Sequence, residues 1–293
     1  MVSTCLICGS TETFQRYPDE LAGRMPTLDY AFSPSTRLTF RIAECRICSH
    51  QFVDPMPQIT DSYGDVVDKT YLNSRRQRVR TAQTLLSRIR HHLNEGDSLL
   101  DVGCNAGFFL DEASRYFKVE GIELSTWAFR EASKLHVVHN YPLSMMKRSS
   151  CYDVVTLIGV IEHFEDPASE LRHIARLLDP EGTLVIFTGT RDSWLPRLLG
   201  KKWWWYQGMH LQYFTRGSLA RALTSNGFEV TQRFTHTSWF SLASLYQSAL
   251  RYPLGRILAS PLRLPFVRKI MIPLRISGET VVIATRRNIA GQD

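Results

Sequence analysis

From Ser98 onward, short apolar runs alternate with stretches in which apolar residues recur every three or four positions. Short apolar runs are typical of strands in a mostly parallel sheet, and the longer spacing is typical of the helices that cover it. The pattern predicts strands at 98–102, 118–123, 152–158 and 183–188, with helices at 107–116, 126–135 and 167–178 between them. A further helix at 218–225 and two strands, at 228–234 and 280–285, follow. This order predicts an α/β fold with a doubly wound, mostly parallel sheet.

The segments that flank this alternation have a different pattern of polar and apolar residues. The first sixty residues are rich in turn formers and poor in strand patterns, whereas 68–93 carries apolar residues at helical spacing, which predicts an amphipathic helix. We therefore expect a small module at 1–60, a linker helix at 61–95, a core at 96–238, a basic amphipathic insertion at 239–277, and the last core strand and tail at 278–293.

The charge of the chain is moderate. Lys and Arg number 35 against 28 Asp and Glu, a net +7 that permits an anionic partner without requiring one. The start of the chain has no apolar run typical of a secretory signal, and no uncharged stretch is long enough to span a bilayer, which needs roughly 18 to 20 apolar residues. We expect a protein of the reducing cytoplasm.

Four of the six cysteines form two pairs with C-x2-C spacing, Cys5 with Cys8 and Cys45 with Cys48. Two such hooks can supply the four thiolates that a tetrahedral zinc ion needs. A closed four-thiolate site leaves no position for water, so we expect Zn²⁺ to be structural. Cys104 and Cys151 have no such partners and are expected to be small buried residues.

A glycine-containing turn follows the first strand of the alternation. The strand enters Gly103-Cys-Asn105-Ala-Gly107, and an apolar helix begins directly afterwards. Such a turn lets the backbone approach a nucleotide closely at a helix N-terminus. Glu123 ends the next strand, where a carboxylate can accept hydrogen bonds from both hydroxyls of a ribose. The spacing departs from the G-x-G-x-x-G fingerprint of dinucleotide folds.

These residues resemble the class I S-adenosylmethionine (SAM)-dependent methyltransferases over about 68–286. The glycine motif is Asp101-Val-Gly-Cys-Asn-Ala-Gly107, the ribose motif is Gly121-Ile-Glu-Leu-Ser125, and two further motifs span 152–167 and 177–184. The resemblance implies a seven-stranded Rossmann-like sheet that binds SAM. It implies cofactor contacts in these motifs, at Asp101, Gly103, Asn105, Gly107, Glu123, Leu124 and Gly159.

The chain departs from the family pattern in two places. Asn105 stands where many relatives have glycine, although asparagine tolerates the left-handed backbone that the turn requires. The segment 141–150 contains no acidic residue that could bind the adenine amino group. Asp153, inside the fourth-strand motif, has two open interpretations, a structural hydrogen bond at the strand edge or a functional role.

The N-terminal hooks, Asp54-Pro55-Met56-Pro57 and the following tyrosines are similar to zinc-containing small-molecule methyltransferases, including sugar C-methyltransferases. This similarity implies that the module covers the substrate side of the cleft, near Tyr63 or Tyr71. It also implies a catalytic base at His210, in a His-Leu-x-Tyr-Phe motif. Met209 replaces the glutamate that precedes this histidine, so a Glu-His pair is not expected there.

A second candidate base follows the fourth strand. His163, next to Glu162, lies in the 159–163 segment that by resemblance lines the methyl-transfer cleft. A histidine near its free pKa suits proton removal from an acceptor. We keep His210, His163 and Glu162 as candidate catalytic residues, with a structural role for His210 as the alternative.

Two further segments have two interpretations each. The run from Lys201 to Tyr206, with its three tryptophans, fits an aromatic lid or a local core. The segment 239–276 holds six cations and no anions among apolar residues, which fits peripheral contact with an anionic membrane or a cap over the cleft.

The sequence thus predicts a SAM-dependent methyltransferase that acts on oxygen or carbon of a sugar, quinone, lipid-linked compound or secondary metabolite. An RNA methyltransferase with a zinc-binding N-terminus is one alternative, disfavoured because no aromatic nucleic-acid platform is visible. A SAM-binding scaffold without activity is the other.

Overall fold

The structure is a computed structural model that describes residues 3–28, 35–147, 152–249 and 270–287. Its main element is a seven-stranded sheet with strand order β10-β11-β8-β7-β4-β5-β6. The strands are β4 (Ser98–Val102), β5 (Lys118–Ile122), β6 (Val137–His139), β7 (Tyr152–Ile158), β8 (Leu178–Gly189), β10 (Phe228–Ser241) and β11 (Met271–Arg286). Strand β11 runs antiparallel to both neighbours and the other pairings are parallel, which confirms the predicted fold class.

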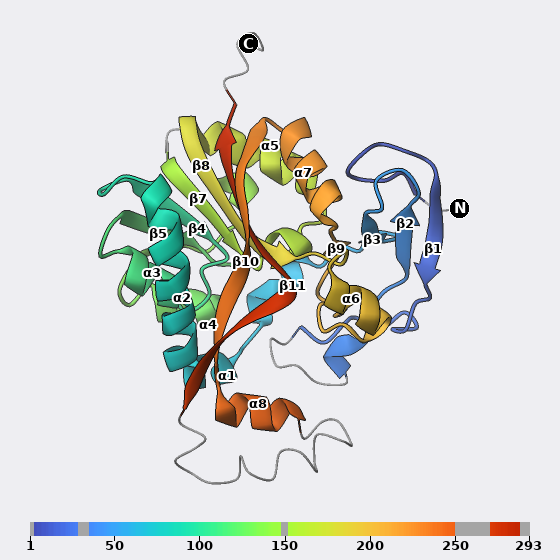
Figure 1. Ribbon diagram of the computed structural model, residues 1–293, viewed down its shortest axis with the longest axis horizontal. Coiled ribbons are helices and arrows are strands. Elements are labelled where there is room, and N and C mark those ends of the chain that lie inside the picture. Colours follow the sequence, from blue (N-terminus) through green and yellow to red (C-terminus); the bar gives the residue numbers. More distant parts are fainter. Residues whose placement is uncertain (1–2, 29–34, 148–151, 250–269, 288–293) are drawn as a thin grey trace.

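The helices cover both faces of this sheet (Figure 1). They are α1 (Lys69–Asn73), α2 (Arg75–Ile89), α3 (Phe108–Ala113), α4 (Thr126–Ala132), α5 (Pro167–Leu177), α6 (Trp194–Leu199), α7 (Arg216–Ser225) and α8 (Leu242–Ala249). Neighbouring strand residues point to opposite faces, so Leu99 packs with Leu85 of α2 and Leu100 packs with the cluster that includes Leu171 of α5. Alternation along each strand therefore builds two separate cores.

The N-terminal residues form a second, four-stranded sheet, of order β1-β2-β3-β9. Its strands are β1 (Thr13–Tyr17), β2 (Ile42–Cys45), β3 (Gln51–Val53) and β9 (Gln212–Tyr213). The expectation that the first sixty residues are poor in strands was wrong, because strands of three to five residues give too little alternation to be recognised. Strand β9 comes from the predicted core, so the two parts share a sheet.

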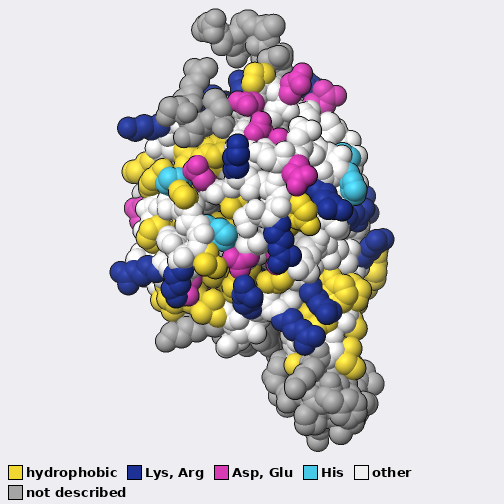
Figure 2. Space-filling view, turned by 90° about the vertical axis from the view of Figure 1, so that its left-hand side faces the viewer, with side chains coloured by type: hydrophobic (Ala, Val, Ile, Leu, Met, Phe, Trp, Pro, Cys, Tyr) yellow, Lys and Arg dark blue, Asp and Glu magenta, His cyan; other side chains and the backbone are white. Residues whose placement is uncertain are grey.

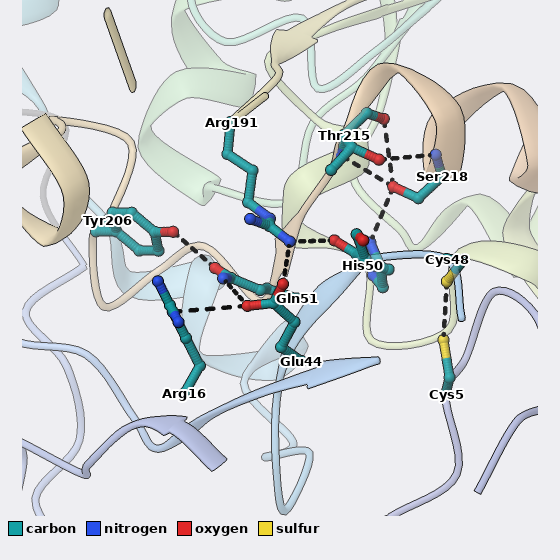
Figure 3. A network of polar contacts seen from close by, with 11 residues as sticks. Cys5, Arg16, Glu44, Cys48, His50, Gln51, Arg191, Tyr206, Thr215 and Ser218 are labelled. Atoms are coloured by element: carbon teal, nitrogen blue, oxygen red, sulfur yellow. Dashed lines mark hydrogen bonds and ion pairs between the residues drawn. The ribbon is translucent and has the colours of Figure 1, made fainter. Parts of the chain in front are cut away.

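A buried polar network joins the small sheet to the core (Figure 3). His50 Nε2 contacts Gln212 Oε1 at 2.9 Å, and Gln51 Oε1 accepts a hydrogen bond from the Tyr206 hydroxyl at 2.6 Å. Arg191 donates to Glu44 Oε1 at 2.8 Å. Since buried polar groups are costly unless they are paired, these contacts fix the small sheet against the core.

The helix predicted at 68–93 is divided into α1 and α2, after a 3-10 helix at Thr60–Asp65. The predicted insertion begins inside β10, continues through α8, and ends inside β11, so its described ends extend an antiparallel strand pair. The remainder of the insertion, with five of its six cations, lies outside the described residues. The division into domains stays a prediction.

Candidate active site

A cavity of about 760 Å³ lies at the carboxyl ends of β4, β5 and β7. Side chains from α2, from the 3-10 helix at Thr60–Asp65, from 204–210, and from β10 and β11 complete its walls. Clefts at this edge of an open α/β sheet are the usual place for ligands, and the volume suits a nucleotide-sized cofactor together with a small acceptor.

The glycine loop forms one wall of the cavity through a left-handed backbone. Gly103, Asn105 and Gly107 have φ values of 73°, 49° and 80°. Asn105 holds this conformation with its own side chain, since Oδ1 accepts a hydrogen bond from Ala106 N at 2.8 Å. A Cβ on Gly103 would lie 2.6 Å from Val160 Cγ2. Only glycine therefore fits the point at which the loop meets the end of β7.

Glu123 lies beside this loop and is 5% exposed. Its Oε2 accepts a hydrogen bond from Asn105 N at 2.8 Å, and its Oε1 accepts one from Ser125 N at 2.7 Å. Burial raises the pKa of Glu123, and these backbone donors oppose the rise. A carboxylate has about four acceptor positions, so each oxygen retains capacity toward the cavity.

Five of the seven predicted cofactor residues line the cavity: Gly103, Asn105, Glu123, Leu124 and Gly159. Gly107 opens helix α3 instead, and Asp101 lies beneath the loop. Asp101 is 2% exposed and accepts a hydrogen bond from Thr156 Oγ1 at 2.6 Å. Burial raises its pKa to about 7.

Sequence reasoning missed Arg78 and Phe108, which line the same part of the cavity. The ring of Tyr71 stacks on Phe108 with centroids 5.2 Å apart, and the Arg78 guanidinium lies 3.7 Å from the centroid of Tyr71. Tyr63 and Tyr71 both line the cavity. Only the packing of α1 and α2 against the glycine loop brings these side chains together, so no local motif marks them.

His163 lies in the 3-10 helix that follows β7, Ile161–His163, and lines the cavity. Its Nδ1 is 2.9 Å from the carbonyl oxygen of Met209 and 2.9 Å from the Tyr63 hydroxyl. A carbonyl oxygen only accepts, so Nδ1 carries the proton and Nε2 is left as an acceptor. Burial lowers the pKa of His163 to about 4.

His210 is held in the same way. Its Nδ1 is 2.7 Å from the carbonyl oxygen of Trp205, which again leaves Nε2 unprotonated. The rings of His210 and His163 have centroids 4.8 Å apart at 82°. Burial, and then the proximity of His163, lower the pKa of His210 well below its usual value. Both imidazoles are therefore neutral at pH 7.

Glu162 completes this cluster, because one possible ligand atom from each of Glu162, His163 and His210 lies within 4.8 Å of the other two. Its carboxyl accepts a hydrogen bond from Thr188 Oγ1 at 2.8 Å, and burial raises its pKa to about 7. Met209 leaves no carboxyl directly before His210, as expected; Glu162, from a different loop, is the carboxyl that lies near both imidazoles. The three groups fit proton transfer, and their donor types would also fit a cation.

Aromatic side chains line another part of the cavity. Trp204 and Trp205 face it, together with His236, Trp239 and Phe240. Trp203 is 1% exposed and packs in the core beneath. Both interpretations of the 201–206 run are therefore correct in part, since its rings form a local core whose outer members line the cavity.

The four paired cysteines lie close enough to bind a zinc ion. Cys5 Sγ is 3.5 Å from Cys48 Sγ, and Cys8 Sγ is 3.5 Å from Cys45 Sγ. Sulfur ligands about 2.3 Å from a tetrahedral zinc are roughly 3.8 Å apart, so the four atoms are near the required spacing. All four are free thiols.

Two other residues have structural roles. Asp153 Oδ2 accepts hydrogen bonds from Ser98 N at 2.8 Å and Ser98 Oγ at 2.7 Å, which decides between its two interpretations. Cys104 is 3% exposed and packs against Gly121, where a Cβ would lie 2.6 Å from Cys104 Sγ. Cys151 lies outside the described residues.

On the face shown in Figure 2, Lys and Arg side chains gather mainly in the lower and right-hand part, among hydrophobic ones, and most acidic side chains lie above them. Arg275, the described cation of the insertion, is exposed and donates to Thr237 Oγ1 at 3.3 Å. Among the residues with a described conformation, none of the helices has the length and apolarity that crossing a bilayer requires.

Comparison with known proteins identifies the family to which this chain belongs. Residues 73–233, more than half of the chain, match the family described as a methyltransferase domain. The ubiquinone biosynthesis O-methyltransferase of Nitrosospira multiformis is 33% identical over 127 residues, which cover 39% of this chain and 53% of the relative. That of Sodalis glossinidius is 30% identical over 121 residues, covering 37% and 48%. The chain thus spans about half the length of these relatives.

Solved structures share the fold at low identity. A chain in the complex of the Trm112 methyltransferase activator with a methyltransferase from Haloferax volcanii has a TM-score of 0.57 at 15% identity, covering 79% of this chain and 99% of its own. A SAM-dependent methyltransferase from Archaeoglobus fulgidus has a TM-score of 0.53 at 16% identity, covering 75% and 100%. The [4+2]-cyclase SpnF, with a TM-score of 0.51 at 17% identity, covering 71% and 80%, shows that this fold also supports other chemistry.

Proposed function

This chain belongs to the methyltransferase domain family, and from that premise we propose that it transfers a methyl group from SAM to oxygen or carbon of a small molecule. The observation that carries the proposal is one cavity that holds both halves of such a site. The glycine loop and Glu123 lie at one end, and two neutral histidines with Glu162 lie in the adjoining wall.

The residues fit SAM. The loop at Gly103 and Asn105 has a left-handed backbone and lines the cavity, and the buried Glu123 carboxylate has acceptor positions left for ribose hydroxyls. Bound SAM would supply an electrophilic methyl group on a sulfonium. Tyr71 and Arg78 would close the outer side of the cofactor, because both line this part of the cavity.

We assign proton removal from the acceptor to His210. Its Nδ1 is fixed by the Trp205 carbonyl, so Nε2 is available to take the proton of an acceptor hydroxyl or carbon acid. His210 lies between the aromatic end of the cavity and His163. Glu162, when ionised, would stabilise the imidazolium that forms. His163 would hold Tyr63 and the Met209 backbone, and it is the alternative base.

We also propose that Cys5, Cys8, Cys45 and Cys48 bind a structural Zn²⁺ ion. The cluster is closed, with four thiolates and no further ligand position, so the metal would organise the small sheet and take no part in catalysis. The sheet packs against the 203–213 segment, which carries His210. The zinc would thereby support the acceptor side of the cavity.

The proposal is tested by calorimetric titration of the purified protein with SAM, with NAD as a control ligand. We expect micromolar SAM binding that Glu123→Ala weakens by at least about tenfold. Glu120→Gln is the matched control, since Glu120 lies three residues earlier, within β5, and contacts His139 and Tyr152 outside the cavity. No SAM binding by folded, zinc-loaded protein would refute the function. SAM binding without turnover of any hydroxylated acceptor would indicate a scaffold.

A further inference from the structure

The pairing of β10 with β11 is interrupted beside the cavity. Thr235 pairs with Thr280 and Thr237 pairs with Arg275, so residues 276–279 of β11 bulge out opposite the single residue His236. Gly278, inside the bulge, has φ 99°, and its carbonyl oxygen accepts a hydrogen bond from Thr190 N at 2.6 Å. Bulges next to active sites redirect side chains, and this one brings Glu279 to the cavity wall.

The Glu279 carboxylate is buried but weakly bound. The residue is 8% exposed, and its oxygens have two long contacts, from Trp204 Nε1 at 3.4 Å and from Ser238 Oγ at 3.4 Å. Burial raises the pKa of Glu279 to about 7. Hydrogen bonds to a carboxylate are normally about 2.7 to 2.9 Å long, so strong acceptor capacity remains unused at this position.

A buried donor lies beside it. The Trp205 ring packs on Gly189, where a Cβ would lie 2.4 Å from Trp205 Cδ2, and Gly189 is the strand partner of Glu279. Trp205 is 8% exposed, and its Nε1 has no hydrogen-bond partner within 3.5 Å among the described residues. The indole N–H nevertheless lies near the Glu279 carboxyl and helps to lower its pKa, so the two groups face the same point. A buried N–H without a close acceptor is destabilising, so a ligand that pairs it gains affinity.

We propose that Glu279 and Trp205 form a subsite for a second hydroxyl of the methyl acceptor, a hydroxyl that is not itself methylated. A hydroxyl can donate to the carboxylate and accept from the indole N–H at the same time. An ammonium group would satisfy Glu279 but not Trp205, and a carbonyl would satisfy only Trp205. This inference rests on the proposed function and narrows its acceptor to a polyol, either a polyhydroxylated aromatic or a sugar.

The aromatic side chains around the subsite suit a flat ring or a pyranose. His236 packs against Phe187 with centroids 4.3 Å apart and the rings tilted by 43°, and Trp205 contacts Phe187 and His210 with centroids 5.9 and 5.2 Å away. These rings connect the subsite to the base at His210. One hydroxyl of the acceptor would therefore face His210 while the other contacts Glu279 and Trp205.

The test uses ligand pairs that differ by one hydroxyl: catechol with phenol, and methyl glucoside with its monodeoxy analogues. Dissociation constants are measured by NMR on the full-length, zinc-loaded protein, with and without S-adenosylhomocysteine. In at least one pair we expect the compound with the extra hydroxyl to bind about tenfold more tightly. Glu279→Gln and Trp205→Phe should remove that difference, and the pair that responds identifies the acceptor as aromatic or sugar.

Trp203→Phe is the matched control. Trp203 Nε1 is also buried without a partner among the described residues, but Trp203 does not line the cavity, so this variant should keep the hydroxyl preference. The ¹⁵N-indole resonance of Trp205 in the unaltered protein gives a second readout and should move only with the dihydroxy or fully hydroxylated ligand.

Equal affinity within both pairs overturns the subsite, and so does a loss of the preference in all three variants. A failure of every compound to bind overturns it as well. If S-adenosylhomocysteine does not bind to folded protein, the proposed methyl transfer fails, while the titrations without that cofactor product still decide the subsite.

Discussion

The imidazoles of His163 and His210 meet at 82° with their centroids 4.8 Å apart, and each is anchored by Nδ1 to a backbone carbonyl. Two neutral rings in contact are stable, but two imidazolium ions would repel each other strongly at this distance. The pair can therefore take up a single proton. This property suits one deprotonation in each catalytic cycle.

The variant His210→Asn should remove the proposed base and keep the local hydrogen bond that orients the side chain. Asparagine places an amide N–H near the former Nδ1 and can still donate to the Trp205 carbonyl, but it has no counterpart of Nε2. We expect kcat to fall by about 10² to 10⁴ with SAM affinity unchanged. His163→Asn, which keeps a donor for the Met209 carbonyl, should lower kcat less. The reverse order of effects, from released S-adenosylhomocysteine, would reassign the base to His163.

The pH dependence of kcat, measured at saturating acceptor, should reflect the ionisation of Glu162. Its pKa of about 7 means that the carboxyl is neutral at lower pH and becomes an anion as the pH rises, which favours proton uptake by His210. The rate should therefore increase through about pH 7. Protonation of His163 should add a further loss only near pH 4.

Glu162→Gln should remove the step near pH 7 and lower the plateau. Asp101 and Glu279 also have pKa values of about 7. Because Glu279 belongs to the proposed acceptor subsite, Glu279→Gln should raise the acceptor KM, but the step in kcat at saturating acceptor should remain. A profile that responds to Glu279→Gln but not to Glu162→Gln would exclude Glu162 as the group that titrates.

Removal of zinc should destabilise the small sheet and the cavity wall above it. Cys5→Ser with Cys48→Ser should lose the metal, measured by elemental analysis, and lower the melting temperature by about 10 °C, the shift for several kcal/mol at this size. The acceptor KM should increase more than the SAM dissociation constant. Cys104→Ser is the control and should retain zinc. Full metal content without Cys5 and Cys48 would contradict the four-cysteine site.

Gly103→Ala should impair SAM binding through steric and backbone strain. The new Cβ would lie 2.6 Å from Val160 Cγ2, at a φ of 73° that side chains rarely adopt. We expect a loss of about 1 to 2 kcal/mol in the free energy of unfolding and weaker SAM binding. The double variant with Val160→Ala should recover part of the binding, because it removes the contact but not the backbone strain. Unchanged SAM affinity in Gly103→Ala would contradict the role of the loop.

The sequence alone determined the features whose parts are neighbours along the chain. The strand-helix alternation predicted six of the seven strands of the large sheet and missed the three-residue β6, and the left-handed loop at Gly103 and Asn105 follows from residue types within one turn. The two C-x2-C hooks behave similarly, because each hook supplies two ligands over a few residues and only their meeting depends on the fold. Local backbone geometry is short-ranged, so the residue pattern is sufficient to predict it.

Only the tertiary structure decided how distant segments combine. It placed Glu162, from a different loop, near His210, and it brought Arg78 and Tyr71 to the glycine loop. It also set Glu279 next to Trp205 through a bulge in β11. These contacts depend on register shifts and on helix packing across the sheet, which are fixed by the sum of many long-range contacts and leave no mark in any single stretch of sequence.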